Sequence, residues 1–285
     1  MKFDWIRVQK AFHAVRTLCR VLEVSRSGFY ASTRRPASSR SVEDSRVVAE
    51  VAAVFEEHKG RYGSVRITRE LRDSGLSVGR HRVRRLMRQA ALRVRRRRRC
   101  WVRTTDSRHR HPIAPNLLAR NFTVDAANRA WVADITYLPT RAGWLYLAVI
   151  LDLYSRAVVG WSMSRRIDGT LTLDALDAAL LRRTVEPGLI AHSDRGTQYA
   201  ATEYQDRLRQ HGMICSMSRK GDCWDNAVAE SFFATLKLEL LGDDIFADHA
   251  TARTLVFEYI EAYYNRRRRH SALGYVSPAA YEKAA

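Results

Sequence analysis

Cysteine is scarce in this chain of 285 residues, and the four that occur, Cys19, Cys100, Cys215 and Cys223, form no CxxC pair. The ligand spacing of structural zinc sites is therefore missing, and we expect reduced cytosolic thiols. No run of about 18 apolar residues occurs, and the start, MKFDWIRVQK, lacks an apolar signal region. We therefore expect a soluble cytoplasmic protein with no membrane partner, whose apolar fraction of 46% is ordinary for a folded core.

Acidic residues are scarce in the first part of the chain. The formal net charge is +19; residues 1–120 contain 30 Lys or Arg against 10 Asp or Glu, and residues 121–285 contain 19 against 20. This asymmetry indicates a polyanion-binding part joined to a domain that needs its carboxylates. We predict an N-terminal helical segment with a possible helix-turn-helix, a basic helix-turn-helix DNA-binding domain, a linker and an α/β domain, at 1–40, 41–100, 101–127 and 128–285.

Helical apolar spacing dominates the basic part. Residues 12–32 show it on both sides of a break at Ser25–Gly28, which is typical of a helix-turn-helix or of a plain helical hairpin. Three further helices are predicted at 42–58, 64–73 and 79–91.

The helix at 79–91 combines a narrow apolar stripe with an arginine-rich remainder. Val83, Leu86, Met87 and Ala90 form the stripe. Such a helix is typical of a recognition helix in a DNA groove, although a solvated basic face has the same pattern. The predicted DNA-binding residues on it are Arg80, His81, Arg82, Arg84 and Arg85. The run Arg95, Arg96, Arg97, Arg98 and Arg99 has no periodicity and is predicted to track phosphates without reading sequence.

Strand-like patterns follow Asn128. Three strands at 129–139, 143–154 and 157–164 are joined by short links, which indicates an antiparallel meander. A helix at 171–184, a strand at 189–192, a helix at 198–210, a strand at 213–218 and helices at 227–241 and 250–265 complete the order. We predict an α/β fold with a ribonuclease H-like mixed sheet flanked by helices, preceded by the basic all-α region, although order alone leaves other α/β folds open.

Three carboxylates in this domain are candidate metal ligands. Asp134 interrupts an apolar strand, where a charge is unfavourable unless it is paired or bound to metal. Asp194 follows the apolar run at 189–191, at the end of a strand where α/β sheets place ligands. Glu230 lies in a helix, with thirty-five residues between it and Asp194, and Lys237 falls on the same stripe two turns later. Asp152 and Asp168 are competitors, of which Asp168 is better explained as a helix N-cap.

An oxygen-only cluster of this kind suits hard divalent cations such as magnesium, which bind carboxylates together with waters and substrate phosphates. Two such ions would stabilise the attacking and leaving oxygens of an in-line displacement at phosphorus. Water as the nucleophile gives a nick with a free 3′-hydroxyl, and that hydroxyl as the nucleophile gives strand transfer.

The chain resembles transposases of the insertion sequence 3 family, specifically the product of the second of their two reading frames. The similarity rests on blocks at 19–31, 61–87, 131–161, 192–200, 216–240 and 264–278, which include WVADITYLPTRAGWLYLAVILDLYSRAVVGW, HSDRGTQYA and SMSRKGDCWDNAVAESFFATLKLEL. It implies an Asp-Asp-Glu recombinase with an integrase catalytic core at 128–285, in which Asp134, Asp194 and Glu230 bind two divalent ions and Lys237 contacts DNA.

The resemblance also implies partners and a location. These are double-stranded DNA at terminal repeats and target sites, a homo-oligomer on DNA, an upstream reading-frame product as fusion or partner, and the bacterial cytosol near the nucleoid. Two alternatives remain open at this point. One is a DNA-binding repressor or assembly subunit without chemistry, and the other is a ribonuclease H-like nuclease that cuts and never joins.

Overall fold

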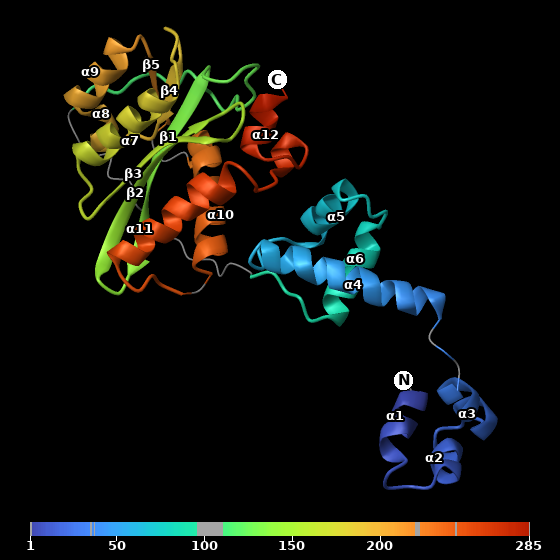
Figure 1. Cartoon of the computed structure of the whole chain (residues 1–285). Helices are drawn as coiled ribbons and strands as arrows, with labels where there is room; N and C mark the ends of the chain where they lie inside the picture. The colour runs from blue at the N-terminus through green and yellow to red at the C-terminus, as the bar shows by residue number, and fades with distance from the viewer. Residues whose placement is uncertain are drawn as a thin grey trace.

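The computed structural model describes residues 2–34, 36, 38–95, 111–219, 223–242 and 244–284. Figure 1 shows an α/β body that follows a series of helices. Within these ranges, no helix is long and apolar enough to cross a membrane. In chain order the elements are α1 (Lys2–Gln9), α2 (Val15–Val21), α3 (Arg26–Arg34), α4 (Ser39–Glu57), α5 (Ser64–Asp73), α6 (Arg80–Gln89), β1 (Ala130–Thr140), β2 (Gly143–Asp152), β3 (Val158–Ser164), α7 (Gly169–Arg182), β4 (Ile190–Ser193), α8 (Thr197–Ala200), α9 (Thr202–Gln210), β5 (Ile214–Met217), the 3₁₀ turn η1 (Cys223–Asn226), α10 (Ala227–Leu240), α11 (His249–Phe257), the π-helical η2 (Glu258–Tyr264), the 3₁₀ turn η3 (Ser271–Leu273) and α12 (Pro278–Lys283).

The first three helices form a small unit with its own core. Ile6, Leu18, Cys19 and Phe29 are buried together and are separate from the other clusters. The two predicted helices are present, but α3 begins inside the predicted break because the Oγ of Ser25 accepts a hydrogen bond from the N–H of Gly28 at 3.0 Å. A serine at this place starts a helix as readily as it ends one. Helix α1 was not predicted, since its pattern is mostly polar and only Ile6 is buried.

Helices α4, α5 and α6 form the second unit, close to the predicted ranges. The predicted stripe of α6 is confirmed, because Val83, Leu86 and Met87 are buried in a cluster that also contains Val47 and Ile67. The turn between α5 and α6 passes through Gly75 at φ +86°, a backbone conformation that favours glycine.

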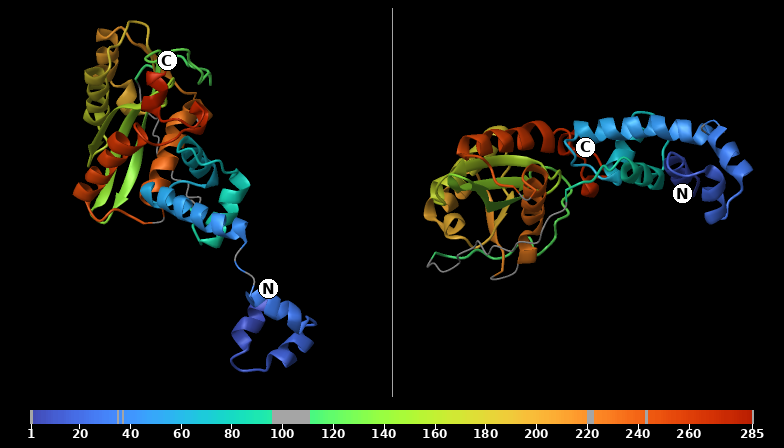
Figure 2. Two further views of the ribbon diagram at one scale, coloured as in Figure 1. Left: turned by 45° about the vertical axis from the view of Figure 1, so that its right-hand side comes forward. Right: turned by 90° about the horizontal axis from the view of Figure 1, so that it is seen from below.

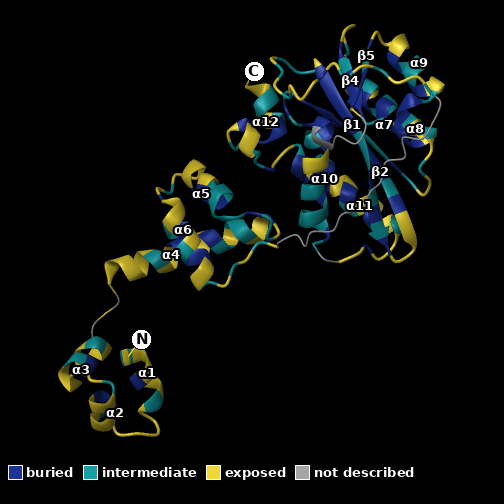
Figure 3. Cartoon of the chain, turned by 180° about the vertical axis from the view of Figure 1, so that it is seen from behind, coloured by how far each residue is buried: buried dark blue, intermediate teal, exposed yellow. Residues whose placement is uncertain are grey.

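The α/β body is built on a five-stranded mixed sheet in the order β3-β2-β1-β4-β5. Strands β1, β2 and β3 form the predicted antiparallel meander, and β4 and β5 run parallel to β1. Helices cover both faces, with α10 and α11 on one and α7, α8 and α9 on the other (Figures 1 and 3). Helix α7 approaches β3 so closely that a Cβ on Gly160 would lie 2.2 Å from the carbonyl oxygen of Ala175.

Two predicted helices differ from the structure. The helix predicted at 198–210 is divided into α8 and α9, because Ala201 adopts an extended conformation with ψ 144°. The helix predicted at 250–265 changes from α11 into the π-helical η2. Its wider turn places residues four and five apart on one face, which buries Tyr259, Ile260, Tyr263 and Tyr264. The short elements η1, η3 and α12 were not predicted.

Candidate active site

Asp134 lies on β1, and Asp194 follows β4, the parallel neighbour of β1. Strand β1 pairs with β4 in a register that sets Val132 opposite His192. Continued two residues past this last pair, the register points Asp134 toward Asp194, and the charge of Asp194 acts on Asp134. Asp194 comes directly after the last residue of β4, as the sequence predicts.

The side chain of Asp134 belongs to the α10 face of the sheet. Along β1, Ala130, Val132 and Leu138 enter the cluster that contains α10, whereas Trp131 and Ala133 enter the cluster of α7, α8 and α9. Because side chains alternate between the two faces of a strand, residue 134 shares the face of Val132.

Helix α10 brings Glu230 to this face. It packs against β1, and Glu230 is exposed in its first turn. Just before the helix, the side-chain amide of Asn226 donates to the carbonyl oxygen of Ala133 at 3.2 Å, which ties the start of α10 to the residue that precedes Asp134. Phe232, Phe233 and Leu236 of this helix pack into the core.

The electrostatics of the cluster follow from this arrangement. Desolvation raises the pKa of Asp134 well above its usual range, the charges of Asp194 and Glu230 raise it further, and Lys237 lowers it. One oxygen of each aspartate is held by a backbone N–H, from Ile135 to Asp134 at 2.8 Å and from Gly196 to Asp194 at 2.9 Å. Two further acids and an ammonium group are therefore within electrostatic reach of Asp134.

The donor set fits a hard divalent cation, because crowded carboxylates that disfavour each other's ionisation are stabilised when a cation lies between them. In the described part of the chain, however, no group of three His, Cys, Asp or Glu side chains is gathered closely enough to hold a metal ion. The charges of Asp194 and Glu230 act on Asp134, but the three side chains do not form a cage for an ion.

Asp225 supports the loop that leads into α10, and sequence reasoning did not single it out. Its buried carboxylate accepts hydrogen bonds from the Nε of Arg120 at 3.1 Å, the Nη2 of Arg219 at 2.9 Å and the Nδ2 of Asn116 at 2.9 Å. The hydrogen bond from Arg219 is the largest of the effects that hold the pKa of Asp225 well below its usual range. In the sequence, Asp225 is visible only as an aspartate just before the predicted helix at 227–241. An ordinary helix N-cap has the same pattern, so the sequence alone does not identify its role.

His192 is a structural residue of the same region. Its Nδ1 lies 2.8 Å from the Oγ of Ser216 and its Nε2 lies 3.1 Å from the Oγ of Ser218. Burial lowers the pKa of His192 to about 4, so the ring is neutral at pH 7. Cys215 is a free thiol whose sulfur accepts a hydrogen bond from Gln205, which agrees with the expectation of reduced thiols for this residue.

The two competing aspartates have structural roles. Asp168 caps α7 by accepting from the N–H of Leu171 at 3.2 Å, as predicted. Asp152 is buried and accepts from the N–H groups of Asn128 and Tyr154, both at 2.7 Å.

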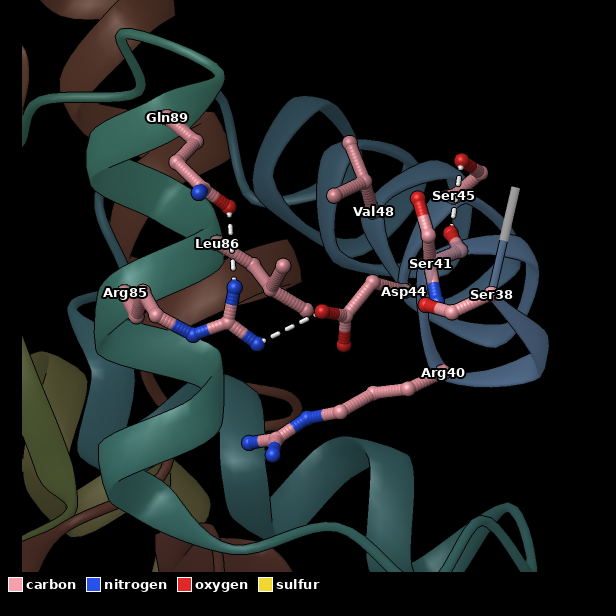
Figure 4. Close-up of a pocket in the computed structure, with 9 residues that line it drawn as sticks. All are labelled: Ser38, Arg40, Ser41, Asp44, Ser45, Val48, Arg85, Leu86 and Gln89. Carbon is pink, nitrogen blue, oxygen red and sulfur yellow. Dashed lines mark hydrogen bonds and ion pairs between the residues drawn. The ribbon is translucent and has the colours of Figure 1, made fainter. Parts of the chain in front are cut away.

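The predicted recognition helix α6 divides its basic residues between two environments. Arg80, His81 and Arg84 are exposed, while Arg82 and Arg85 are half-buried. Asp44 of α4 accepts from the Nε of Arg82 at 2.8 Å and from the Nη2 of Arg85 at 2.7 Å. Figure 4 shows Arg85 reaching Asp44 and Gln89 across a hollow of about 520 Å³ between α4 and α6. The outward-facing residues of the predicted set are therefore Arg80, His81 and Arg84.

Of the remaining predicted DNA-binding residues, Lys237 lies on α10 and Arg95 lies near its end, and the others are outside the described ranges. Lys237 is half-buried two turns beyond Glu230, and its charge acts on Asp134, as expected for one stripe. The Nη1 of Arg95 donates to the carbonyl oxygen of Leu241 at 3.3 Å, which places it at the end of α10. Arg96, Arg97, Arg98 and Arg99 lie outside the described residues.

Known protein families match the chain along most of its length. The family model described as integrase core domain matches residues 124–223, a second integrase core model matches 211–278, and a model of an HTH-like domain matches 43–99. A relative described as the insertion element IS600 uncharacterized 31 kDa protein of Shigella sonnei is 44% identical over 266 residues, 93% of this chain and 97% of that protein.

Transposase InsF for insertion sequence IS3A of Escherichia coli (strain K12) is 42% identical over 284 residues, 99% of this chain and 98% of that protein. Among solved structures, the HTLV-2 integrase catalytic core domain in complex with magnesium aligns with a TM-score of 0.40 at 19% identity, over 55% of this chain and 97% of that one.

The matches agree with the predicted organisation of a helix-turn-helix region before a ribonuclease H-like integrase core. Two relatives more than 40% identical extend over almost the entire chain. The resemblance drawn from the sequence blocks is confirmed: the chain belongs to the insertion sequence 3 family of transposases.

Proposed function

We propose that this transposase nicks a donor strand at the ends of its element, with Asp134, Asp194 and Glu230 as its metal ligands. The resulting 3′-hydroxyl then attacks a phosphodiester of target DNA, which joins the donor strand to that phosphorus and releases a target 3′-hydroxyl. The observation that supports this most strongly is the parallel pairing of β1 with β4, because Asp134 lies two residues beyond the last pair on β1 and Asp194 follows the end of β4. Desolvation and the neighbouring carboxylates raise the pKa of Asp134, and perturbed carboxyl groups of this kind cluster at functional sites.

Mg²⁺ or Mn²⁺ fits the oxygen-only donor set, and we propose two ions. When bound, such ions stabilise the attacking and leaving oxygens of an in-line displacement. The chain contributes the positions of the ligands: backbone N–H groups orient both aspartates, and Asn226 holds the first turn of α10 against β1. Lys237 carries a positive charge close to the same carboxylates, where it would bind a DNA phosphate.

DNA binding is assigned to the basic part of the chain, within the proposed boundaries 41–100. Arg80, His81 and Arg84 face outward on α6, which follows a tight turn from α5 as a recognition helix does. Joining requires two element ends to be held at once. We therefore propose a homo-oligomer on DNA, with an upstream reading-frame product as fusion or partner.

The proposal is tested with a labelled element-end duplex in Mg²⁺, comparing wild type with Glu230→Gln. Glu203→Gln serves as the matched control, because Glu203 is an exposed glutamate in the first turn of α9. We expect nicked and joined products from the wild type and the control and neither from Glu230→Gln, with duplex binding retained in all three.

Other outcomes separate the alternatives. Cleavage without any joined product would indicate a ribonuclease H-like nuclease. Binding without cleavage in the wild type, with the upstream product also present, would indicate a DNA-binding or assembly subunit. Full activity of Glu230→Gln would remove Glu230 from the site.

A further inference from the structure

Four consecutive arginines, Arg266–Arg269, follow η2 and look like a solvated or DNA-binding cluster in the sequence. The structure uses two of them differently. Arg268 and Arg269 are buried or half-buried, and each pairs with a glutamate in a different part of the molecule. In Figures 1 and 2 this C-terminal segment lies between α5 and the end of α10.

Arg268 holds the catalytic helix α10. Its Nε lies 3.0 Å from both carboxylate oxygens of Glu239, and its Nη2 lies 2.8 Å from Oε1. The hydroxyl of Tyr259 donates to Oε2 of the same carboxylate at 2.8 Å. The two charged side chains are only 5% and 6% exposed, so each charge depends on the other for its partner.

Arg269 holds α5 of the helix-turn-helix domain. Its Nε and Nη2 donate to the two oxygens of Glu70 at 2.7 and 2.9 Å, and Nη2 also lies 2.7 Å from Asp73. Its backbone N–H donates to the hydroxyl of Tyr62 at 2.8 Å. A bidentate arginine–carboxylate pair fixes orientation as well as distance.

Two arginines of the helix-turn-helix domain donate hydrogen bonds back to the C-terminal segment and to α10. From the helix-turn-helix domain, Arg66 donates to the carbonyl oxygen of Arg269 at 2.9 Å, and Arg61 donates to the carbonyl oxygen of Glu239 at 3.3 Å. The guanidinium of Arg61 also lies over the ring of Tyr263, 4.5 Å from its centre. The hydrophobic cluster that contains Val83 of α6 continues without interruption into Phe232 of α10.

We infer that Arg268–Glu239 and Arg269–Glu70, which we call the arginine clamp, fix the DNA-reading helix α6 at a set distance from the catalytic carboxylates. The inference rests on the proposed function. Glu239 lies nine residues after Glu230 on one helix, about 13 Å along its axis and about 180° around it. The clamp therefore grips the side of α10 that points away from Glu230, and it sets how far the nick falls from the sequence that α6 reads.

The test uses the full chain with Arg269→Ala, Arg269→Lys and the exchange Glu70→Arg with Arg269→Glu. Arg267→Ala is the matched control, because Arg267 pairs with Glu57 and both side chains are at least half exposed. The position of Mg²⁺-dependent nicks is mapped to the nucleotide on an element-end duplex. Duplex affinity and thermal unfolding are measured in parallel.

We expect Arg269→Ala to keep its duplex affinity. Its nicking at the wild-type nucleotide should fall roughly tenfold, because a misplacement of about 1 Å can reduce a rate by about 100-fold. Arg269→Lys should lose an intermediate amount, since lysine cannot form the bidentate pair, and the charge exchange should restore part of the loss. The control should match the wild type. Unchanged nick positions in Arg269→Ala would overturn the inference.

A second measurement keeps the clamp testable even if the wild type does not nick. Donor and acceptor dyes are placed at Ser77, in the turn before α6, and at Glu203 on α9, both of which are exposed. We expect a single energy-transfer distance in the wild type and a broader distribution in Arg269→Ala. A narrow, unchanged distribution would overturn the clamp independently of the proposed activity. Absence of nicking with a broadened distribution would overturn only the proposed function.

Discussion

Replacing Arg268 by methionine should destabilise the protein more than any surface arginine substitution. The guanidinium accounts for three close contacts with the carboxylate of Glu239, and the carboxylate is 6% exposed. Without the arginine, the carboxylate of Glu239 keeps the hydrogen bond from the hydroxyl of Tyr259. Removing one partner of a buried pair of this kind costs about 3–5 kcal/mol of unfolding free energy.

The expected change is large enough to measure by thermal unfolding. For a body of 150–250 residues, each kcal/mol lowers the melting temperature by roughly 2–4 °C, so Arg268→Met should melt roughly 6–20 °C below the wild type. Adding Glu239→Gln should restore much of the loss, because the amide is uncharged and its oxygen still accepts from Tyr259. The size of this recovery gives the coupling between the two residues.

Arg267→Met is the control for this measurement. Arg267 pairs with Glu57, but their side chains are 50% and 55% exposed, and exposed pairs contribute about 0–1 kcal/mol. The reasoning fails if Arg268→Met melts within about 2 °C of the wild type, where the conversion above corresponds to less than about 1 kcal/mol. It also fails if the double variant is no more stable than the single one.

Further predictions concern the carboxylates, one histidine and α6. Desolvation and the neighbouring carboxylates raise the pKa of Asp134, so its ionisation destabilises the fold above the usual carboxyl pKa. At pH 7 without divalent ions Asp134→Asn should therefore melt higher than the wild type, and excess Mg²⁺ should raise the melting temperature of the wild type alone. Asp225→Asn replaces a buried carboxylate that accepts from two arginines and should lower the unfolding free energy by about 1.5–3 kcal/mol in urea titrations. Burial lowers the pKa of His270 to about 3 from 6.5, so stability should fall as pH drops below 6.5, and His270→Gln should show a shallower fall in melting temperature between pH 7 and pH 5. Arg84→Ala should reduce the salt slope of duplex binding by about one, and an unchanged slope would remove the exposed Arg84 from the DNA surface.

The candidate ligands were visible in the sequence because each violates its local pattern. Asp134 stands among apolar strand residues, and the spacing of Glu230 and Lys237 places them on one stripe of a helix. The proximity of Asp134 to Asp194 was not derivable in the same way. It depends on the register of a parallel pair whose strands are about sixty residues apart, and nothing local to either strand determines that register.

The clamp was not predicted, because a run of arginines has the same sequence pattern whether it is solvated, bound to DNA or buried. The partner of Arg269 is Glu70, 199 residues earlier in the chain. Neither residue lies in an apolar setting that would mark its charge as unusual. Only the approach of α5 to the C-terminal segment shows that Arg268 and Arg269 hold two parts of the molecule together.

Helix α10 carries both a candidate metal ligand, Glu230, and a residue of the arginine clamp, Glu239. Each residue turns an α-helix by about 100°, so Glu230 and Lys237 are about 20° apart, while Glu239 lies on the opposite side. Phe232 and Leu236 fall between these directions and are buried against the sheet. Because one rigid helix carries both sides, the contacts that hold Glu239 also determine where Glu230 is presented. A substitution in the clamp should therefore leave the carboxylate chemistry intact and change the phosphodiester to which it is applied.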